Sequence, residues 1–287
     1  MTIRKVAVLG AGTMGHGIAQ VVAMAGYGVT LYDVDMVSVQ TGLQRIRKNL
    51  EKGVQLGKVP DAIRETAVAA LSTSTDVSEA VDGADLVIEA APESMDLKKR
   101  IFSEVEAGVT PEAILATNTS SLSIGEIAAT LDHPQRFLGL HFFNPVHVMQ
   151  LVEVVHGPAT DPAVLDVALQ FVRRIDREPI VVKDSPGFAS SRLGVVLGLE
   201  AMRMVEEGVA SPEDIDRAME LGYRHPMGPL KLTDLVGLDV RLGIARYLHE
   251  TLGSEAFRPP EILQRMVDEG RTGKKSGRGF YEWGDPA

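Results

Sequence analysis

The sequence predicts an α/β domain built on a parallel sheet, followed by an all-α domain. Three observations support this division. Short β-branched, apolar runs alternate with helical patterns as far as Lys183. These runs show little alternation between apolar and polar residues, which is typical of strands buried on both faces. After Lys183 the pattern becomes almost entirely helical.

The first domain is expected to span residues 1–183. We expect strands at residues 6–9, 29–32, 86–89, 114–117 and 137–142, and two more at residues 151–155 and 180–182. Helices are expected at residues 14–25, 38–53, 96–107 and 124–131, with another beginning at Thr160-Asp161-Pro162. This alternation indicates a parallel sheet with crossover helices.

The second domain is expected to span residues 184–287. The turn-forming stretch Asp184-Ser185-Pro186-Gly187 marks the boundary. Residues 193–206 are apolar around most of a helix circumference until Gly208, so we expect this helix to be buried on several sides. Ser211 is placed to cap the next helix.

Composition narrows the class of protein. The chain has 287 residues, 45% hydrophobic and 24% charged, which fits two globular domains. The absence of cysteine excludes disulfides, thiolate metal sites and a cysteine nucleophile, and we expect no metal. A net charge of -10 disfavours nucleic acid and anionic membranes as partners. The chain enters an apolar strand at Val6 without a signal peptide, so a cytoplasmic location is expected.

A glycine-rich motif follows the first expected strand. Gly10, Gly12 and Gly15 fit the pattern G-x-G-x-x-G, with Thr13 and Met14 between the last two glycines. Gly10 permits a tight turn, Gly12 lets the backbone approach a pyrophosphate, and Gly15 lets helix and strand pack closely. The phosphates are then expected at the N-terminus of the following helix. This context predicts a Rossmann-type dinucleotide-binding domain.

Asp33 ends the second expected strand, where an acidic residue accepts hydrogen bonds from both ribose hydroxyls. A 2′-phosphate would meet a like charge there, so the predicted cofactor is NAD and not NADP. The alternative is a structural glycine turn followed by a surface aspartate. Strand, glycines, helix and acid all occur in register, which favours dinucleotide binding.

His141 is the best candidate for an acid/base among the seven histidines. It closes an expected buried strand, and ligands bind at the carboxyl ends of parallel strands. Glu153 lies within the apolar run of residues 151–155, where a carboxylate needs a partner. His141 is a plausible partner, although a structural core histidine is the alternative.

Two further groups of residues are candidates for binding. Asn118 and Ser120 follow another strand end, where amides and hydroxyls can hold a carbonyl or carboxamide; Ser121 or Ser123 is expected to cap the helix at Ile124. The second group lies at helical spacing beside Asn49 and consists of Arg45, Lys48 and Lys52. These cations can hold phosphates of a polyanionic ligand, or form an ordinary solvated face.

These residues together resemble the 3-hydroxyacyl-CoA dehydrogenase family, particularly its short single-unit members that act on 3-hydroxybutyryl-CoA. The resemblance covers nearly the whole chain. It is carried by five stretches in order, at residues 10–19, 116–122, 141–146, 226–229 and 272–281. The family implies a role in fatty acid metabolism, and it implies a dimer joined through the helical C-terminal domain.

The resemblance also implies roles for individual residues. His141 would be the catalytic acid/base paired to Glu153, and Ser120 would contact the substrate oxygen and the nicotinamide side. The helix that carries Asn49 and Lys52 would bind CoA, and the substrate would lie in the cleft between the domains. The residues expected to contact NAD are Asp33, Glu93, Lys98, Asn144 and Lys275.

One position departs from the family. The motif Pro-Gly-Phe-x-x-Asn-Arg commonly carries a functional asparagine, but this chain has Ser191 there. The departure concerns the identity of the substrate more than the reaction class, and we expect Ser191 to retain a positioning role. Two other functions remain open: a dehydrogenase of another small hydroxy acid such as a sugar acid, and a non-catalytic NAD-binding sensor.

Overall fold

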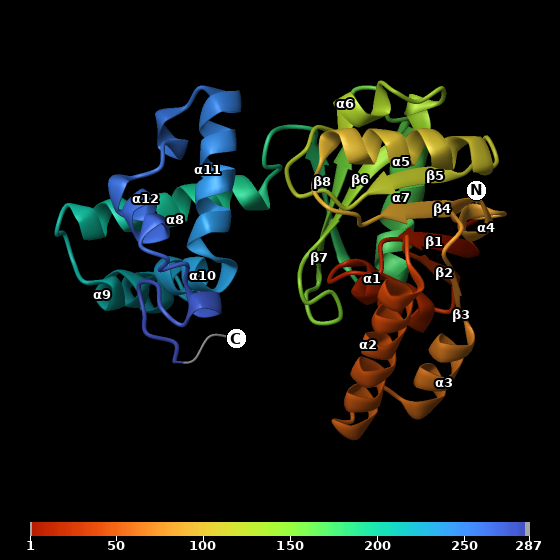
Figure 1. The fold of residues 1–287 in the computed structure, drawn as a ribbon, viewed down its shortest axis with the longest axis horizontal. Coiled ribbons are helices and arrows are strands. Elements are labelled where there is room, and N and C mark those ends of the chain that lie inside the picture. Colours follow the sequence, from red (N-terminus) through yellow and green to blue (C-terminus); the bar gives the residue numbers. More distant parts are fainter. Residues whose placement is uncertain (1, 285–287) are drawn as a thin grey trace. The chain divides into compact units, whose positions relative to one another are not determined.

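The computed structural model describes residues 2–284. The chain forms two compact units that divide between Ser185 and Pro186. The sequence placed this boundary between residues 183 and 184. Figure 1 shows the first unit as a sheet covered by helices and the second as helices alone.

The first unit contains an eight-stranded sheet in the order β3-β2-β1-β4-β5-β6-β7-β8. The five strands that alternate with helices in the sequence (β1, β2, β4, β5 and β6) are parallel, as expected, and β8 is parallel to β7, but β7 is antiparallel to β6. The reason is the connection at residues 143–150, which is shorter than the roughly dozen residues that a parallel crossover needs. The strands are β1 (Lys5–Leu9), β2 (Gly28–Tyr32), β3 (Leu71–Ser74), β4 (Leu86–Glu89), β5 (Ile114–Thr117), β6 (Phe137–Phe142), β7 (Leu151–His156) and β8 (Glu178–Lys183).

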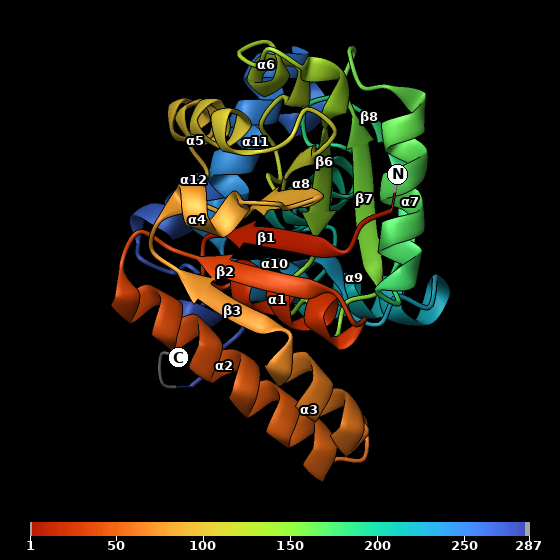
Figure 2. The same ribbon diagram turned by 90° about the vertical axis from the view of Figure 1, so that its right-hand side faces the viewer.

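Helices cover both faces of the sheet. On one face α1, α2, α3 and α7 share a buried core with the strands, and α4, α5 and α6 lie on the other face (Figure 2). The helical segments are α1 (Gly15–Met24), α2 (Met36–Gln55), α3 (Asp61–Ala69), α4 (Val77–Val81), α5 (Met95–Gly108), α6 (Ile124–Ala128), η1 (Pro134–Arg136) and α7 (Pro162–Arg174).

Besides the short helix η1, three elements of the first unit were not expected from the sequence. These are β3, α3 and α4, all of which lie between Leu56 and Ala84. The helix expected at residues 124–131 ends earlier, at Ala128. Ser123 caps that helix, since its hydroxyl accepts the N–H of Glu126 at 3.2 Å.

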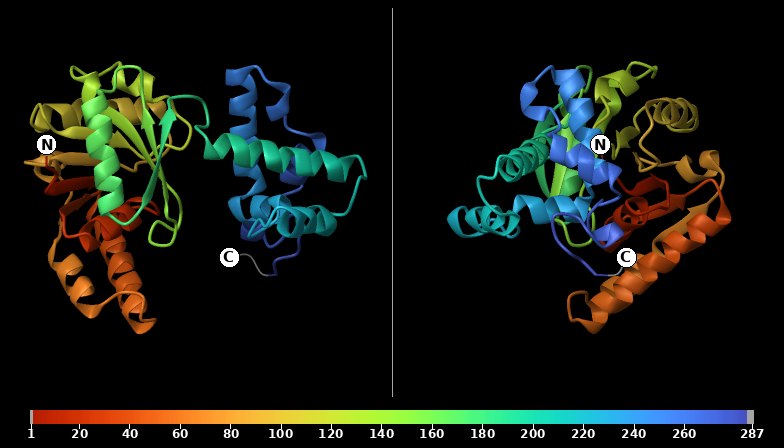
Figure 3. Two further views of the ribbon diagram at one scale, coloured as in Figure 1. Left: turned by 180° about the vertical axis from the view of Figure 1, so that it is seen from behind. Right: turned by 60° about the vertical axis from the view of Figure 1, so that its left-hand side comes forward.

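In the second unit α8 crosses α10, α11 and α12 and contacts all three (Figure 3). Its buried positions include Val195, Leu199 and Met202, whereas Leu193 is 69% exposed. The expectation that this helix is buried on several sides is therefore wrong for its first turns. The segments are α8 (Ser190–Glu206), α9 (Pro212–Arg217), η2 (Ala218–Gly222), α10 (Pro229–Val236), α11 (Leu238–Leu252), η3 (Glu255–Phe257), α12 (Glu261–Asp268) and η4 (Lys274–Ser276).

A buried carboxylate holds the C-terminal stretch against this helical unit. Asp234 of α10 is 0% exposed and accepts the backbone N–H groups of Phe280 and Tyr281 and the indole N–H of Trp283. A buried carboxylate with three donors is well satisfied. The contacts fix residues 280–283, which follow Lys275.

Candidate active site

The glycine motif forms a cradle between β1 and α1. Gly10 has a φ of +101°, and a Cβ there would lie 2.7 Å from the carbonyl oxygen of Ala90. A side chain on Gly15 would collide with the carbonyl oxygen of Gly10. Above Gly12, by contrast, no described atom lies within 4 Å of an added Cβ. The cradle therefore excludes side chains beneath the turn and leaves open space above it, which is the arrangement a pyrophosphate needs.

A pocket of about 790 Å³ opens beside this cradle. Gly10, Gly12, Thr13, Met14 and Asp33 line it, as the sequence predicts for a dinucleotide site. The remaining walls are mostly apolar and come from Val34, Val77, Leu97 and Ile101. Such walls suit the flat face of an adenine ring.

Asp33 is fixed in this pocket by the backbone. One carboxylate oxygen accepts the N–H of Ala11 at 2.7 Å, and the other accepts the N–H of Val34 at 2.8 Å. Each carboxylate oxygen can accept more than one hydrogen bond. Asp33 therefore keeps acceptor capacity for ribose hydroxyls while its orientation is set by the loop.

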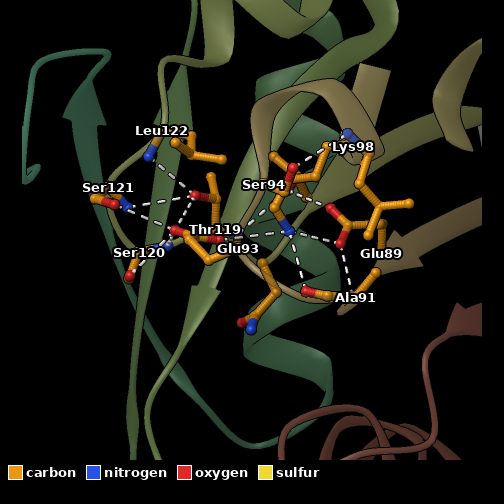
Figure 4. A network of polar contacts seen from close by, with 12 residues as sticks. Glu89, Ala91, Glu93, Ser94, Lys98, Thr119, Ser120, Ser121 and Leu122 are labelled. Atoms are coloured by element: carbon orange, nitrogen blue, oxygen red, sulfur yellow. Dashed lines mark hydrogen bonds and ion pairs between the residues drawn. The ribbon is translucent and has the colours of Figure 1, made fainter. Parts of the chain in front are cut away.

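A buried ion pair joins Glu89 and Lys98 (Figure 4). Glu89 at the end of β4 is 0% exposed, and Lys98 of α5 is 1% exposed. The Lys98 ammonium donates to Glu89 at 2.6 Å and to the carbonyl oxygen of Ala91 at 3.3 Å. The Thr117 hydroxyl also donates to Glu89, at 2.6 Å. This network ties together the ends of β4 and β5.

Lys98 is buried, and its ammonium reaches the carbonyl oxygen of Ala91, which lines the dinucleotide pocket; its contact with the cofactor stays a prediction. Its ammonium is occupied by Glu89, because a buried carboxylate requires a compensating cation. Glu89 itself was missed by the sequence analysis. Like Glu153, it is an acidic residue in an apolar strand, and this pattern could have identified it.

Glu93 carries the network outward to the surface. One oxygen of its carboxylate accepts the Thr119 hydroxyl at 2.6 Å, the Ser120 N–H at 3.0 Å and the Ser121 hydroxyl at 3.2 Å. The Ser120 hydroxyl donates to the same oxygen at 3.3 Å. Burial opposes ionisation of Glu93, but the Thr119 hydroxyl, the Lys98 ammonium and the Ser120 N–H outweigh it and lower its pKa. Glu93 is therefore a stable anion, and its carboxylate orients Ser120.

His141 and Glu153 form a buried pair, as the sequence predicted. The imidazole Nδ1 lies 2.7 Å from the Glu153 carboxylate, and the two residues stand directly opposite each other on antiparallel β6 and β7. Directly opposite residues project from the same face of a sheet, which explains the short contact. His141 is 7% exposed and Glu153 is 0% exposed. The carboxylate fixes the tautomer and orientation of the ring.

The loops that surround His141 are set by other predicted residues. The Asn118 side-chain oxygen accepts the Phe142 N–H at 2.9 Å, which joins the ends of β5 and β6. The Phe143 ring lies 4.5 Å from the His141 ring, centroid to centroid. Asn144 follows it and is exposed. Asn118 thus supports the strand end that carries the histidine.

The predicted basic face lies along α2. Arg45, Lys48 and Lys52 are exposed, and none of them forms an ion pair with any residue that the structure describes. Asn49 donates from its side chain to Gln20 of α1 at 3.2 Å, which anchors the helix. Unpaired cations on an acidic protein leave this face free for an anionic ligand.

Further positive charge lies beside the Lys52 end of α2. Burial lowers the pKa of His147, and the charges of His16, Arg177 and Lys52 lower it further. The four groups come from α1, α2 and the connections next to β7 and β8. Lys52 and Arg177 therefore lie near a histidine that favours its neutral form, a group of residues that the sequence analysis did not foresee.

In the second unit the structure places Ser191 and Lys275 on separate segments. Ser191 is the second residue of α8 and is half-buried. Lys275 lies in η4, where its ammonium pairs with Asp239 at 2.6 Å. Both side chains are partly exposed, and Lys275 is held by one carboxylate.

Comparison with known proteins identifies the family. The model described as "3-hydroxyacyl-CoA dehydrogenase, NAD binding domain" matches residues 5–185, and the one described as "3-hydroxyacyl-CoA dehydrogenase, C-terminal domain" matches residues 187–283. The chain belongs to the 3-hydroxyacyl-CoA dehydrogenase family. The resemblance stated from the motifs is therefore confirmed, as is an NAD-binding domain followed by a helical one.

Several family members are similar over almost the whole chain. A probable 3-hydroxybutyryl-CoA dehydrogenase of Bacillus subtilis is 45% identical over 284 residues, 99% of this chain and 98% of that one. The crystal structure of (S)-3-hydroxybutyryl-CoA dehydrogenase PaaH1 from Ralstonia eutropha superimposes with a TM-score of 0.95 at 39% identity, covering 98% and 99% of the two chains. A 3-hydroxyadipyl-CoA dehydrogenase of Escherichia coli is 41% identical over 99% of this chain and 60% of its own length.

Two other expectations concern absences. Within residues 2–284 no helix combines the length and the apolar character needed to cross a membrane. Among the same residues no cluster of histidine, aspartate and glutamate has the arrangement of a metal site.

Proposed function

We propose that His141 is the acid/base of this NAD-dependent 3-hydroxyacyl-CoA dehydrogenase and that the chain oxidises the 3-hydroxyl of a short 3-hydroxyacyl-CoA, or catalyses the reverse reduction. The observation that carries this proposal is the buried His141–Glu153 pair at 2.7 Å. An imidazole at a strand end is placed to accept a proton from a bound hydroxyl. Glu153 stabilises the positive charge that the ring then acquires.

The cofactor site fits NAD on the evidence of the cradle and of Asp33. Gly12, Thr13 and Met14 offer open backbone at the start of α1 for the pyrophosphate, and Asp33 offers its carboxylate to a ribose. NAD when bound accepts the hydride that leaves C3. The protein needs only to align the substrate and to move the hydroxyl proton.

Ser120 is proposed to hold the substrate oxygen beside His141. Its backbone and hydroxyl are oriented by Glu93, whose own position depends on Thr119 and Lys98. Glu93, Lys98, Asn144 and Lys275 remain proposed NAD contacts. Ser191 is proposed to position the thioester or the histidine.

The basic face of α2 is proposed to bind the phosphates of CoA. Arg45, Lys48 and Lys52 supply three cations that the described residues leave unpaired. The acyl chain is a separate question, because the similar proteins named above act on hydroxybutyryl and hydroxyadipyl thioesters. We propose a short acyl chain, a homodimer formed through the helical domain, and a cytoplasmic location.

Initial rates with NAD on a chain-length series of 3-hydroxyacyl-CoAs test this proposal, with free 3-hydroxy acids and a sugar acid as controls. Oxidation of thioesters with little turnover of the free acids is expected. Faster turnover of a free hydroxy acid would favour the dehydrogenase of another small hydroxy acid. NAD binding without turnover of any substrate would favour a sensor, which has no need of the His141–Glu153 pair.

A further inference from the structure

Arg241 is a buried cation without a partner. It lies in α11 and is 7% exposed. Within residues 2–284 its guanidinium forms no hydrogen bond or ion pair, and Nε is buried with no acceptor. Among residues 2–284 the other buried cations have partners: Lys98 and Arg136 pair with glutamates, and the terminal nitrogens of Arg177 donate to two backbone carbonyls, although Nε of Arg136 and of Arg177 also lacks an acceptor. Arg241 is therefore an exception that calls for a ligand.

The electrostatic surroundings of Arg241 agree with this geometry. Burial lowers the pKa of its guanidinium, and no neighbouring carboxylate acts in the opposite direction. Asp239, two residues earlier, is paired with Lys275. A buried charge without a counter-ion is costly, so a site of this kind is completed by an anion. The two terminal nitrogens are not completely buried as Nε is, so they are the donors that retain exposed surface.

The Arg241 guanidinium lies beside Gly194 of α8, where the absence of a side chain leaves room for it. A Cβ added to Gly194 of α8 would lie 3.4 Å from Nη1 and 3.9 Å from Nη2 of Arg241. A longer side chain at this position would extend into the guanidinium. Gly194 is three residues after Ser191, so both lie on the same face of α8. Arg241 therefore presents its donors beside the face of α8 that carries Ser191.

We propose that Arg241 binds a carboxylate at the far end of the acyl chain, so that the preferred substrates are 3-hydroxyacyl-CoA thioesters of dicarboxylic acids. The inference rests on the proposed function, which places Ser191 at the substrate. A guanidinium matches a carboxylate with two parallel hydrogen bonds. A chain that ends in a methyl group leaves the same guanidinium desolvated and unpaired, which gives strong discrimination.

The phosphates of CoA are a poorer match for Arg241. They are bulky and highly charged, and the exposed cations of α2 already offer them a solvated surface. A guanidinium that is 7% exposed admits only a slender group. The end of an acyl chain has that shape, and its carboxylate supplies the single negative charge that the site lacks.

The test compares two CoA thioesters of equal length, 3-hydroxyadipyl-CoA and 3-hydroxyhexanoyl-CoA, which differ in a terminal carboxylate or methyl group. We measure kcat/KM with NAD for the wild type, Arg241→Met and Arg246→Met. Arg246 is the matched control, because it lies exposed on the same helix and contacts Gln264. We expect the wild type to prefer the carboxylate. Arg241→Met should lower kcat/KM for the adipyl thioester about ten- to hundredfold and leave the hexanoyl thioester little changed.

Several outcomes would overturn the inference. If the wild type oxidises both thioesters without preferring the one with a carboxylate, the inference about Arg241 is wrong and the proposed function still stands. Equal losses on both thioesters in Arg241→Met would assign the residue to CoA or to packing. If Arg241→Met fails to fold, the wild-type ratio of the two kcat/KM values decides alone. Failure to oxidise either thioester, or 3-hydroxybutyryl-CoA, would remove the proposed function and this inference with it.

Discussion

Replacing Glu153 with glutamine isolates the charge behind the catalytic histidine. Glutamine has nearly the same size as glutamate, and its amide oxygen can still accept from Nδ1, so the ring keeps its orientation. What disappears is the negative charge 2.7 Å from the imidazole, at a position that is 0% exposed. That charge matters most when the ring carries the proton of the substrate hydroxyl.

The size of the effect follows from the contact. A buried hydrogen bond to a charged group contributes roughly 1.5–3 kcal/mol. A loss of about 2 kcal/mol from the transition state corresponds to a roughly thirtyfold lower kcat. His141→Ala should cost about a hundredfold or more, the usual contribution of an acid/base. NADH binding should survive both changes, because neither residue lines the dinucleotide pocket.

The assay is NADH formation at saturating 3-hydroxybutyryl-CoA, with NADH affinity measured by fluorescence. Glu178→Gln is the matched control, since Glu178 begins the neighbouring strand β8 and is exposed. The double variant His141→Ala with Glu153→Gln should be no slower than His141→Ala alone, because Glu153 acts through the ring. A Glu153→Gln enzyme within twofold of the wild type would refute the reasoning, as would additive losses in the double variant.

Three further predictions concern the cofactor, CoA and substrate contacts. Asp33→Ala should weaken NAD(H) binding and relax discrimination against NADP(H) in parallel titrations; a wild type that prefers NADP(H) would contradict this. Removing the charges of Arg45, Lys48 and Lys52 should raise KM for acyl-CoA more than KM for a truncated thioester without the nucleotide, whereas equal effects would mean a merely solvated face. Ser191→Ala should reduce kcat/KM roughly tenfold, the value of one ordinary hydrogen bond, and Ser191→Asn should stay active. Unchanged kinetics in Ser191→Ala would make that residue structural.

The parts of the fold that the sequence predicted are those with strong local signals. The buried strands β1, β4 and β5 are apolar runs, and α1 follows an unambiguous glycine turn. The strand β3 was missed because Leu71-Ser72-Thr73-Ser74 is polar and pairs only with β2 at the edge of the sheet. Edge strands need no apolar run, so periodicity does not detect them. The direction of β7 was not predicted, because an apolar pattern alone carries no direction, although the short connection at residues 143–150 does.

For the site residues as well, the prediction depended on signals that are local in the sequence. His141 and Glu153 were found because each is an ionisable residue in an apolar strand, a conflict visible in the sequence. Glu89 presents the same conflict and was overlooked. Lys98 was placed at the cofactor by resemblance, but its contacts depend on how far α5 brings it towards Glu89. That distance is a tertiary property, and no local pattern specifies it.

Ser191, which replaces the usual asparagine of its motif, and the buried Arg241 can belong to one change in substrate recognition. The sequence marked Ser191 because a motif normally has asparagine there, but it gave no reason to notice Arg241, since an arginine in a helix is usually exposed. The burial of Arg241 depends on Gly194, which stands on another helix and leaves room for the guanidinium. Gly198, one turn further along α8, faces the Thr233 hydroxyl in the same manner. A face of small residues on α8 thus admits polar groups from α10 and α11. If this face binds the acyl chain, the loss of the asparagine amide and the gain of the guanidinium are one change in substrate recognition, and the response of Ser191→Asn to the two six-carbon thioesters should depend on Arg241.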